Sequence, residues 1–265
     1  MATLRTLLTG LLGLFATMSQ AADPAERRPG GVGPEYEVRT FEAADGTSLR
    51  YGWLTPKHAK TPADRAGEKF PLVVCLHGRG GNSTAADVLV GPKLRDKYPC
   101  YVFVPDSGRT WWAVTQGRGE PGDAEGLPRA VEAIRALLKS EPIDPARVYV
   151  TGQSMGGIGS WAAAARYPDL FAAAAPVCGE WSVDDVPKML PVAIWNFHGD
   201  KDATVSVEPS RKLVAALKQA GGNVKYTEFA GVGHGSWNPA YAMPELWAWL
   251  FEQRKVAADK QADKK

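Results

Sequence analysis

The sequence has few cysteines, and the spacing of these cysteines matches no metal site and contains no Cys-x-x-Cys pair. Cys75, Cys100 and Cys178 lie far apart in the chain, and we expect no essential disulfide among them. An excess of one charge is also missing, because 31 basic and 29 acidic residues give a net charge of +2 without a long basic stripe. This balance gives no support for nucleic-acid binding.

Long hydrophobic runs are absent, apart from the apolar segment Leu7–Met18 near the N-terminus. That run is about twelve residues long, shorter than the roughly 20 residues that a membrane-spanning helix needs. Arg5 precedes it, and Ser19–Ala21 follows with the small-x-small pattern of a cleavage site. We therefore expect residues 1–21 to be a cleaved export signal, which predicts a periplasmic or secreted protein. The alternative is a membrane anchor.

The remaining chain has the composition of a folded domain. Apolar residues make up 45% of the 265 residues, enough for the core of one large α/β domain. Residues 22–34 are rich in proline, glycine and charge and are interpreted as a flexible leader. Residues 35–253 form the predicted domain, and residues 254–265 are predicted to be a charged, disordered tail.

Strand and helix signals alternate along the predicted domain, which indicates a mostly parallel central sheet with helices on both faces. An Asp-Gly pair between the first two strands predicts an antiparallel N-terminal hairpin. In such sheets, sites form at the carboxyl ends of the strands. Strands are expected at 36–41, 48–54, 70–76, 101–104, 147–151, 171–177, 192–197 and 224–229, and helices from Thr84, at 125–140 and 155–167, before 221–222 and at 245–251.

One serine follows a predicted strand within a glycine-rich turn. The segment Gly152-Gln153-Ser154-Met155-Gly156 has the Gly-x-Ser-x-Gly pattern of a nucleophile elbow, with a strand before it and a helix after it. A tight turn without catalytic function is the alternative. The surrounding strand and helix favour Ser154 as a nucleophile.

A serine nucleophile needs a base, and the chain has four histidines. His58 lies in a polar loop and is interpreted as a surface residue, whereas His77 and His198 end predicted strands. In this type of fold the order along the chain is serine, acid, histidine. Only His234, in a glycine-flanked loop after the last strand, leaves room for an acid after the serine, so we predict it to be the general base.

The acid and the oxyanion-binding groups should also follow strands. Asp200 and Asp202 both come after the strand at 192–197, and their spacing does not separate them. The backbone N–H of Met155, directly after the serine, is predicted to bind the oxyanion. Its second donor is predicted to be the backbone N–H of Arg79, in the glycine-rich loop after the strand at 70–76.

Aromatic residues are plentiful in predicted loops near the same edge. Trp111, Trp112, Trp181 and Trp237 follow strands, and Arg109 lies beside the first two. One interpretation is an aromatic pocket for a sugar ring or an aryl acyl group, with Arg109 facing a carboxylate or hydroxyl. The other is that the tryptophans anchor loops by burial and that Arg109 is an ordinary surface residue.

The segments LHGRGG, DPARVYVTGQSMGG, RYPDLFAAAAPVCG, HGDKDATV and GVGHGSW resemble the α/β-hydrolase superfamily. They are most similar to secreted carboxylesterases related to feruloyl esterases, polyhydroxyalkanoate depolymerases and the hydrolase domain of prolyl oligopeptidases. The resemblance extends over residues 36–253. It implies the α/β-hydrolase fold, and it implies neither a metal nor an organic cofactor.

The resemblance also assigns roles to residues. It implies Ser154 as nucleophile, His234 as base, the later carboxylate Asp202 as acid, and the amides of Met155 and Arg79 as the oxyanion hole. Prolyl oligopeptidases carry a propeller domain for which this chain is too short, which argues against that activity. Dienelactone hydrolases, another group of relatives, use a cysteine nucleophile, so the serine here disfavours ester hydrolysis of that type.

Taken together, these features predict an exported serine carboxylesterase that acts on short-acyl or aryl esters of the feruloyl or acetyl type. The ester is expected to be a small molecule or to be linked to a polysaccharide. A polyester depolymerase or an acyltransferase on the same residues is the alternative within enzymes. A non-catalytic binding protein that kept the fold is the alternative outside them.

Overall fold

The computed structural model describes residues 27–57, 67–112 and 126–255. The predicted export signal, the start of the leader, His58 and most of the predicted tail lie outside these ranges. Within them, no helix has the length and apolar character needed to cross a membrane. In chain order the elements are η1 (Pro29–Gly31), β1 (Glu37–Glu42), β2 (Ser48–Leu54), β3 (Phe70–Leu76), α1 (Thr84–Leu89), α2 (Pro92–Lys97), β4 (Tyr101–Pro105), α3 (Gly126–Ser140), β5 (Ile143–Gln153), α4 (Met155–Arg166), β6 (Ala173–Val177), η2 (Val183–Asp185), α5 (Val186–Met189), β7 (Ala193–Gly199), α6 (Glu208–Gln219), β8 (Val224–Phe229), α7 (Trp237–Ala242) and α8 (Pro244–Glu252).

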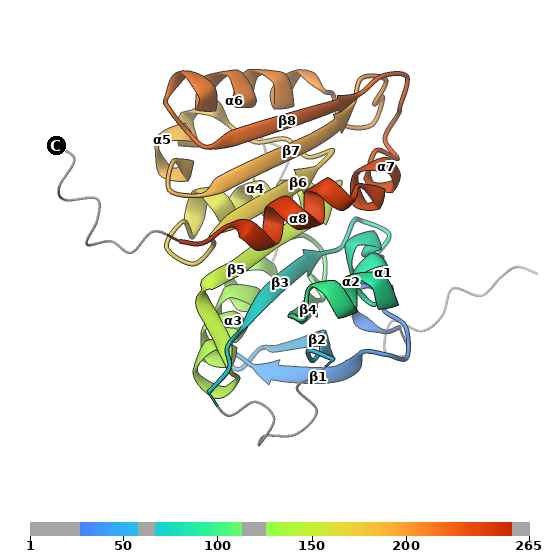
Figure 1. The fold of residues 1–265 in the computed structure, drawn as a ribbon, viewed down its shortest axis with the longest axis vertical. Coiled ribbons are helices and arrows are strands. Elements are labelled where there is room, and N and C mark those ends of the chain that lie inside the picture. Colours follow the sequence, from blue (N-terminus) through green and yellow to red (C-terminus); the bar gives the residue numbers. More distant parts are fainter. Residues whose placement is uncertain (1–26, 58–66, 113–125, 256–265) are drawn as a thin grey trace, which may run out of the picture.

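The strands form one eight-stranded sheet in the order β1-β2-β4-β3-β5-β6-β7-β8 (Figure 1). β1 pairs with β2, and β2 with β4, in antiparallel fashion, whereas the strands from β4 through β3 to β8 pair in parallel. The predicted fold class, a mostly parallel sheet with an antiparallel N-terminal hairpin, is therefore confirmed. All six parallel strands end at the same edge, where the candidate residues follow β3, β5, β7 and β8.

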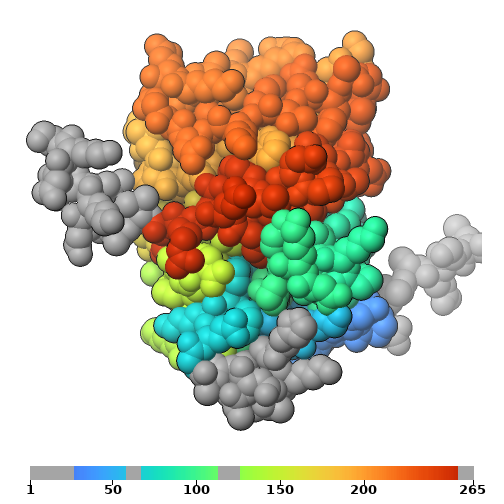
Figure 2. All heavy atoms as spheres, viewed as in Figure 1, coloured from blue at the N-terminus to red at the C-terminus, as the bar shows by residue number. Residues whose placement is uncertain are grey.

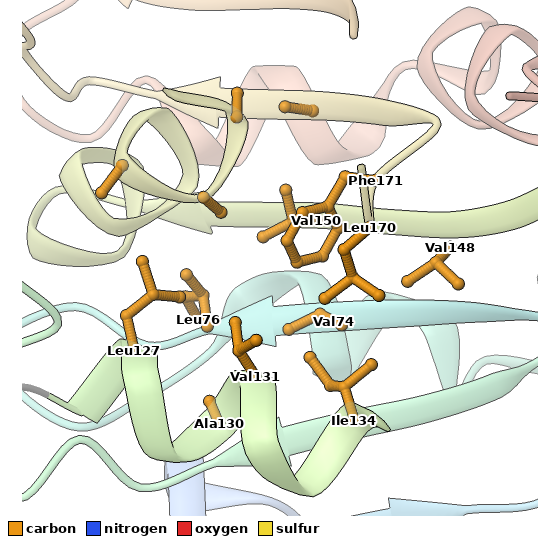
Figure 3. Close-up of a cluster of buried hydrophobic side chains, with 14 of the residues drawn as sticks. Val74, Leu76, Leu127, Ala130, Val131, Ile134, Val148, Val150, Leu170 and Phe171 are labelled. Atoms are coloured by element: carbon orange, nitrogen blue, oxygen red, sulfur yellow. The ribbon is translucent and has the colours of Figure 1, made fainter. Parts of the chain in front are cut away.

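Helices cover both faces of the sheet because side chains alternate along the buried strands. Val74 and Leu76 of β3 and Val148 and Val150 of β5 face α3, whose Leu127, Val131 and Ile134 pack against them (Figure 3). Intervening residues, such as Val73 and Tyr149, belong to a second buried cluster on the opposite face. That face, the near one in Figures 1 and 2, is covered by α1, α2, α7 and α8. The first face is covered by α3, α4, α5 and α6 (Figure 1).

Three short helices, α2, α5 and α7, were not predicted. Each has six residues or fewer, too few for a helical repeat of apolar residues to be recognised. Prolines occupy the first turn of α2 and α5, where they are compatible with a helix but also typical of loops.

The N-terminal segment differs from the prediction of a flexible leader. Within residues 27–34, Pro29 and Gly30 are buried in η1, and Val32 is only 2% exposed. Helix α1 begins at Thr84, as expected, and Ser83 caps it, because the Ser83 side chain accepts a hydrogen bond from Ala86 N. Thr84 is bonded to the end of β5, as described below.

Candidate active site

Ser154 lies in a strained turn between β5 and α4. Its backbone has φ of 56° and ψ of −119°, and only one other non-glycine residue of the described ranges, Cys178, has a positive φ. Gly156 makes the turn possible, because a Cβ there would lie 2.0 Å from Leu76 O. Backbone strain of this kind persists only where the surroundings enforce it, and it is concentrated at functional sites. The turn holds the serine hydroxyl at the N-terminal end of α4.

The loop after β8 brings a histidine to this serine. His234 Nε2 lies 2.9 Å from Ser154 Oγ, and His234 Nδ1 lies 2.7 Å from Asp202 Oδ2. With the proton on Nδ1 donated to the carboxylate, Nε2 is an acceptor for the serine hydroxyl. The three side chains, which are separated by 80 and 32 residues in the chain, thus form one line of hydrogen bonds. This arrangement is able to activate a serine hydroxyl for nucleophilic attack.

The two aspartates that the sequence left open have different partners. Asp202 has a fully buried side chain, and its Oδ1 accepts hydrogen bonds from Thr204 N and Val205 N, both at 2.9 Å. Burial opposes its ionisation, but the hydrogen bonds from His234 and these N–H groups outweigh burial and lower the pKa of Asp202. Asp200 accepts a hydrogen bond from Gly231 N at 2.7 Å and so connects the end of β7 to the loop before His234.

His198, which ends β7, supports the loop that carries Asp202. Its Nδ1 lies 2.8 Å from Ser210 Oγ, and its Nε2 lies 3.0 Å from Val205 O and 3.3 Å from Asp202 Oδ2. Burial is the main cause that lowers the pKa of His198 and favours its neutral form. The residue therefore links β7 and α6 to the carboxylate.

The glycine-rich loop after β3 lies across the nucleophile turn. A Cβ on Gly78 would be 3.4 Å from Gln153 O and 3.8 Å from Ser154 Cβ, so the loop passes directly beside the elbow. Arg79, the next residue, has an exposed side chain. Met155 begins α4, and the first N–H groups of a helix have no acceptor within the helix. Both predicted oxyanion donors therefore belong to backbone that borders Ser154.

Several residues that fix this loop had no predicted role. His77 Nε2 accepts a hydrogen bond from Ser107 N at 3.1 Å, which leaves Nδ1 to donate to Gly78 O at 2.8 Å. The side chain of Gln153 exchanges two hydrogen bonds with Thr84, to its N–H at 3.1 Å and to its hydroxyl at 3.0 Å. In the sequence, the position of His77 at the end of a strand was the only indication of this role. It did not reveal that His77 bonds to Ser107 and Gly78.

Cys178 packs against the elbow from inside the core. Its sulfur accepts a hydrogen bond from Ser154 N at 3.3 Å, and burial raises the pKa of the thiol to about 12. Cys178, Asp202 and His234 offer ligand atoms within 4.8 Å of one another, the one such set among the described residues. The imidazole and carboxylate of this set are already engaged, because Asp202 accepts the Thr204, Val205 and His234 N–H groups and His234 Nε2 faces Ser154 Oγ.

Of the two interpretations of the tryptophans, loop anchoring by burial holds for Trp111 and Trp181. Trp111 is fully buried and donates to His77 O at 2.8 Å, so it packs beneath the glycine-rich loop. Trp181 is 5% exposed and meets Trp112 edge to face at 6.2 Å. The guanidinium of Arg166, at the end of α4 opposite Ser154, lies 5.2 Å from the centre of the Trp112 ring. These indole rings pack against α4 and the core, where burial stabilises them, and do not point to the edge that carries Ser154.

Trp237 is the predicted pocket residue that contacts the candidate triad. Its partly exposed ring meets the His234 imidazole edge to face, with centroids 5.3 Å apart. Arg109 has an exposed side chain in the loop after β4, and its N–H donates to Ser107 O. Trp237 is therefore the aromatic residue with a direct route to influence substrate at His234.

The chain is similar to several known hydrolases. A family model described as the dienelactone hydrolase family matches residues 103–264. Poly(3-hydroxyalkanoate) depolymerase C of Paucimonas lemoignei is 37% identical over 120 residues, which are 41% of this chain and 28% of that protein. Feruloyl esterase B of Neurospora crassa is 32% identical over 127 residues, 44% of this chain and 41% of that protein. The chain thus spans less than half the length of either relative.

A solved structure described as a thermostable esterase has the same fold. It is 37% identical, with a TM-score of 0.75, and the match covers 83% of this chain and 64% of that one.

Proposed function

This chain belongs to the dienelactone hydrolase family, and we propose that it hydrolyses carboxylic esters with Ser154 as the nucleophile. One observation carries the proposal: the line of hydrogen bonds from Ser154 Oγ through His234 to the buried Asp202. A buried carboxylate that orients a histidine against a serine hydroxyl is the arrangement that acyl transfer needs. The esterase and the feruloyl esterase to which the chain is similar support the same chemistry.

The reaction proceeds in two acyl-transfer steps. Ser154 Oγ attacks the ester carbonyl while its proton passes to His234 Nε2, and Asp202 stabilises the resulting imidazolium. The N–H groups of Met155 and Arg79 bind the oxyanion of the tetrahedral intermediate. Collapse of the intermediate releases the alcohol, which takes the proton from His234. Water then attacks the acyl-enzyme with His234 as base. The free acid departs, and His234 returns the proton to Ser154 Oγ.

We propose short-acyl and aryl esters, free or linked to a polysaccharide, as the substrates of an exported enzyme. The partly exposed ring of Trp237 beside His234 supports an aryl or sugar group at this position. The apolar segment Leu7–Met18 and the following Ser19–Ala21 support export to the periplasm or the medium.

A polyester depolymerase acting through the same residues is the second candidate. It is favoured by an open groove of about 740 Å³ between α1–α2 and α7–α8, lined mainly by apolar groups. Thr84 and Asn238 line this groove, and they belong to the first turns of the helices that follow the glycine-rich loop and the His234 loop. An apolar polymer chain would have a surface to lie on near the catalytic edge.

Ester profiling of the purified protein tests the proposal. The panel contains p-nitrophenyl acetate, butyrate and octanoate, methyl ferulate, acetylated xylan and a poly(3-hydroxybutyrate) suspension. We expect turnover of the acetyl, butyryl and feruloyl esters that disappears in Ser154→Ala. Turnover restricted to the polyester would favour the second candidate. Ester turnover that persists in Ser154→Ala would refute the nucleophile.

A further inference from the structure

We propose that the segment Arg27–Val32, here termed the N-terminal strap, positions the oxyanion loop, defined as His77–Ser83. The inference rests on the proposed function, because it concerns the placement of the Arg79 N–H that binds the oxyanion. The strap lies about 50 residues before the loop in the chain and beside it in the fold. Part of the segment that was expected to be a flexible leader would thus position the Arg79 N–H for catalysis.

The strap bonds to the oxyanion loop at two points. The Arg27 guanidinium donates a hydrogen bond to Gly80 O, and Gly30 O accepts one from Ser83 N at 2.9 Å. Gly80 directly follows Arg79, so only the backbone of these two residues separates the Gly80 carbonyl from the Arg79 N–H, and a movement of the carbonyl is transmitted to it. The loop contains three glycines, Gly78, Gly80 and Gly81, and needs such external contacts to hold one conformation.

The strap is itself well fixed, as a positioning element must be. Gly30 and Gly31 have φ of 60° and 66°, a conformation that other residues rarely adopt. A Cβ on Gly30 would lie 2.3 Å from Val104 Cγ1, so the strap rests directly on β4. Val32 is buried, and the hydroxyl of Tyr36, just after the strap, donates to Ala86 O of α1 at 2.7 Å. The Arg27 side chain therefore extends from a rigid base.

Hydrogen bonds within the loop, from Gly81 N to Gly78 O at 2.8 Å and from Gly78 N to Asn82 O at 3.3 Å, close its turn, and contacts outside the strap fix its two ends. His77 is held by Ser107 and Trp111 at the start, and Thr84 is held by Gln153 just after the end. The guanidinium of Arg27 meets the loop between these anchors, at Gly80. We therefore assign Arg27 as a positioning residue, which acts on the oxyanion only through the loop.

The test compares Arg27→Gln with Arg27→Lys and with Arg95→Gln. Arg95 is a matched control, because its guanidinium also donates to a backbone carbonyl, Thr55 O, but away from the oxyanion loop. Three quantities are measured: kcat and KM for an aryl ester, the inhibition constant of a trifluoromethyl ketone that forms an oxyanion on the serine, and hydrogen exchange of the loop amides. We expect Arg27→Gln to lower kcat about tenfold and to raise the inhibition constant of the ketone by the same factor, with KM little changed.

Hydrogen exchange at Gly81 and Ser83 should become faster in Arg27→Gln, and Arg27→Lys should recover part of both effects. Equal kcat, ketone inhibition and loop exchange in Arg27→Gln and Arg95→Gln would overturn the proposal. A lower kcat without weaker ketone inhibition would also overturn it, because the oxyanion would then be unaffected. If the wild type hydrolysed no ester, the proposed function would fail, while faster loop exchange in Arg27→Gln would still support the strap.

Discussion

The catalytic edge has two regions that are built in different ways. The nucleophile side consists of Ser154, Asp202 and His234 at the ends of β5, β7 and β8, which in the proposed mechanism act through their side chains. The oxyanion side consists of the loop after β3 and the first residue of α4, which in the proposed mechanism act through backbone N–H groups. On the first side the residue type determines the chemistry. On the second side almost any residue supplies an N–H, and its placement determines the chemistry.

The supports of the two regions differ accordingly. Asp202 is oriented by the Thr204 and Val205 N–H groups of its own loop, and the loop of His234 is held by Asp200 of the adjacent loop. The oxyanion loop is held by distant segments, including Ser107 after β4 and the N-terminal strap. Substitutions on the nucleophile side should therefore remove catalysis outright, whereas those on the oxyanion side should misplace a group and reduce it.

The largest difference is expected between the two neighbouring aspartates. Asp202→Asn should lower kcat about 10⁴-fold, because the amide favours the wrong tautomer of His234 and does not stabilise the imidazolium. Asp200→Asn changes a group bonded only to Gly231 N in the loop and should alter kcat by no more than about threefold. Steady-state kinetics on an aryl ester measure both. Equal losses in the two variants would mean that Asp200 shares the role.

A smaller loss is expected from the anchor of the oxyanion loop. His77→Phe leaves the buried Ser107 N–H without its acceptor, which should lower the free energy of unfolding by about 1–3 kcal/mol. The displaced loop should lower kcat about 100-fold and leave KM nearly unchanged. Kinetics and urea unfolding of the same preparation separate the two effects. A stability loss without a loss of kcat would show that His77 does not position the oxyanion loop for catalysis.

The tryptophans sharpen the comparison further. Trp237→Ala removes the ring beside His234 and should lower kcat/KM for aryl esters about tenfold. Trp112→Ala acts at the far end of α4 and should cost about 1–2 kcal/mol of stability while kcat/KM stays near the wild-type value. Should Trp112→Ala instead change the preference among esters, the pocket would extend to that part of the molecule.

The smallest effect is a pH dependence of stability. The pKa of His198 is lower in the folded protein than in the unfolded chain, chiefly through burial, so the unfolded state binds more protons between the two values. The free energy of unfolding should therefore rise with pH from the folded pKa up to about 6.5, the ordinary value for histidine. Urea unfolding from pH 5 to 8 should show a shallower rise in His198→Gln. An identical pH dependence in the variant would contradict this role for His198.

The contrast between the two regions also explains what could be predicted from the sequence. The strand and helix order, the Gly-x-Ser-x-Gly turn and the loop of His234 were predictable because each depends on a local pattern of residue types. The choice between Asp200 and Asp202 was not, because both follow the same strand and only their three-dimensional partners differ. The resemblance to known hydrolases was needed to favour Asp202.

The sequence predictions for the N-terminal strap and the tryptophans differ from the structure because both depend on contacts between distant residues. The strap combines proline, glycine and arginine, a composition typical of mobile segments, and its order comes from packing on β4 and from contacts with the oxyanion loop, both 50 or more positions away. Trp111 and Trp112 were assigned to the pocket because they follow a strand, but the position of a loop in the sequence does not reveal which way its side chains turn. Burial of the rings decided their direction.

The most direct test of the account is fluorophosphonate labelling followed by peptide mapping. A serine hydroxyl that is activated by His234 and Asp202 reacts with this probe, whereas an ordinary serine does not. We predict one adduct, on Ser154, which is absent in Ser154→Ala and strongly reduced in Asp202→Asn. An unlabelled wild-type protein, or labelling that persists unchanged in Ser154→Ala, would contradict the central claim that this turn presents a catalytic nucleophile.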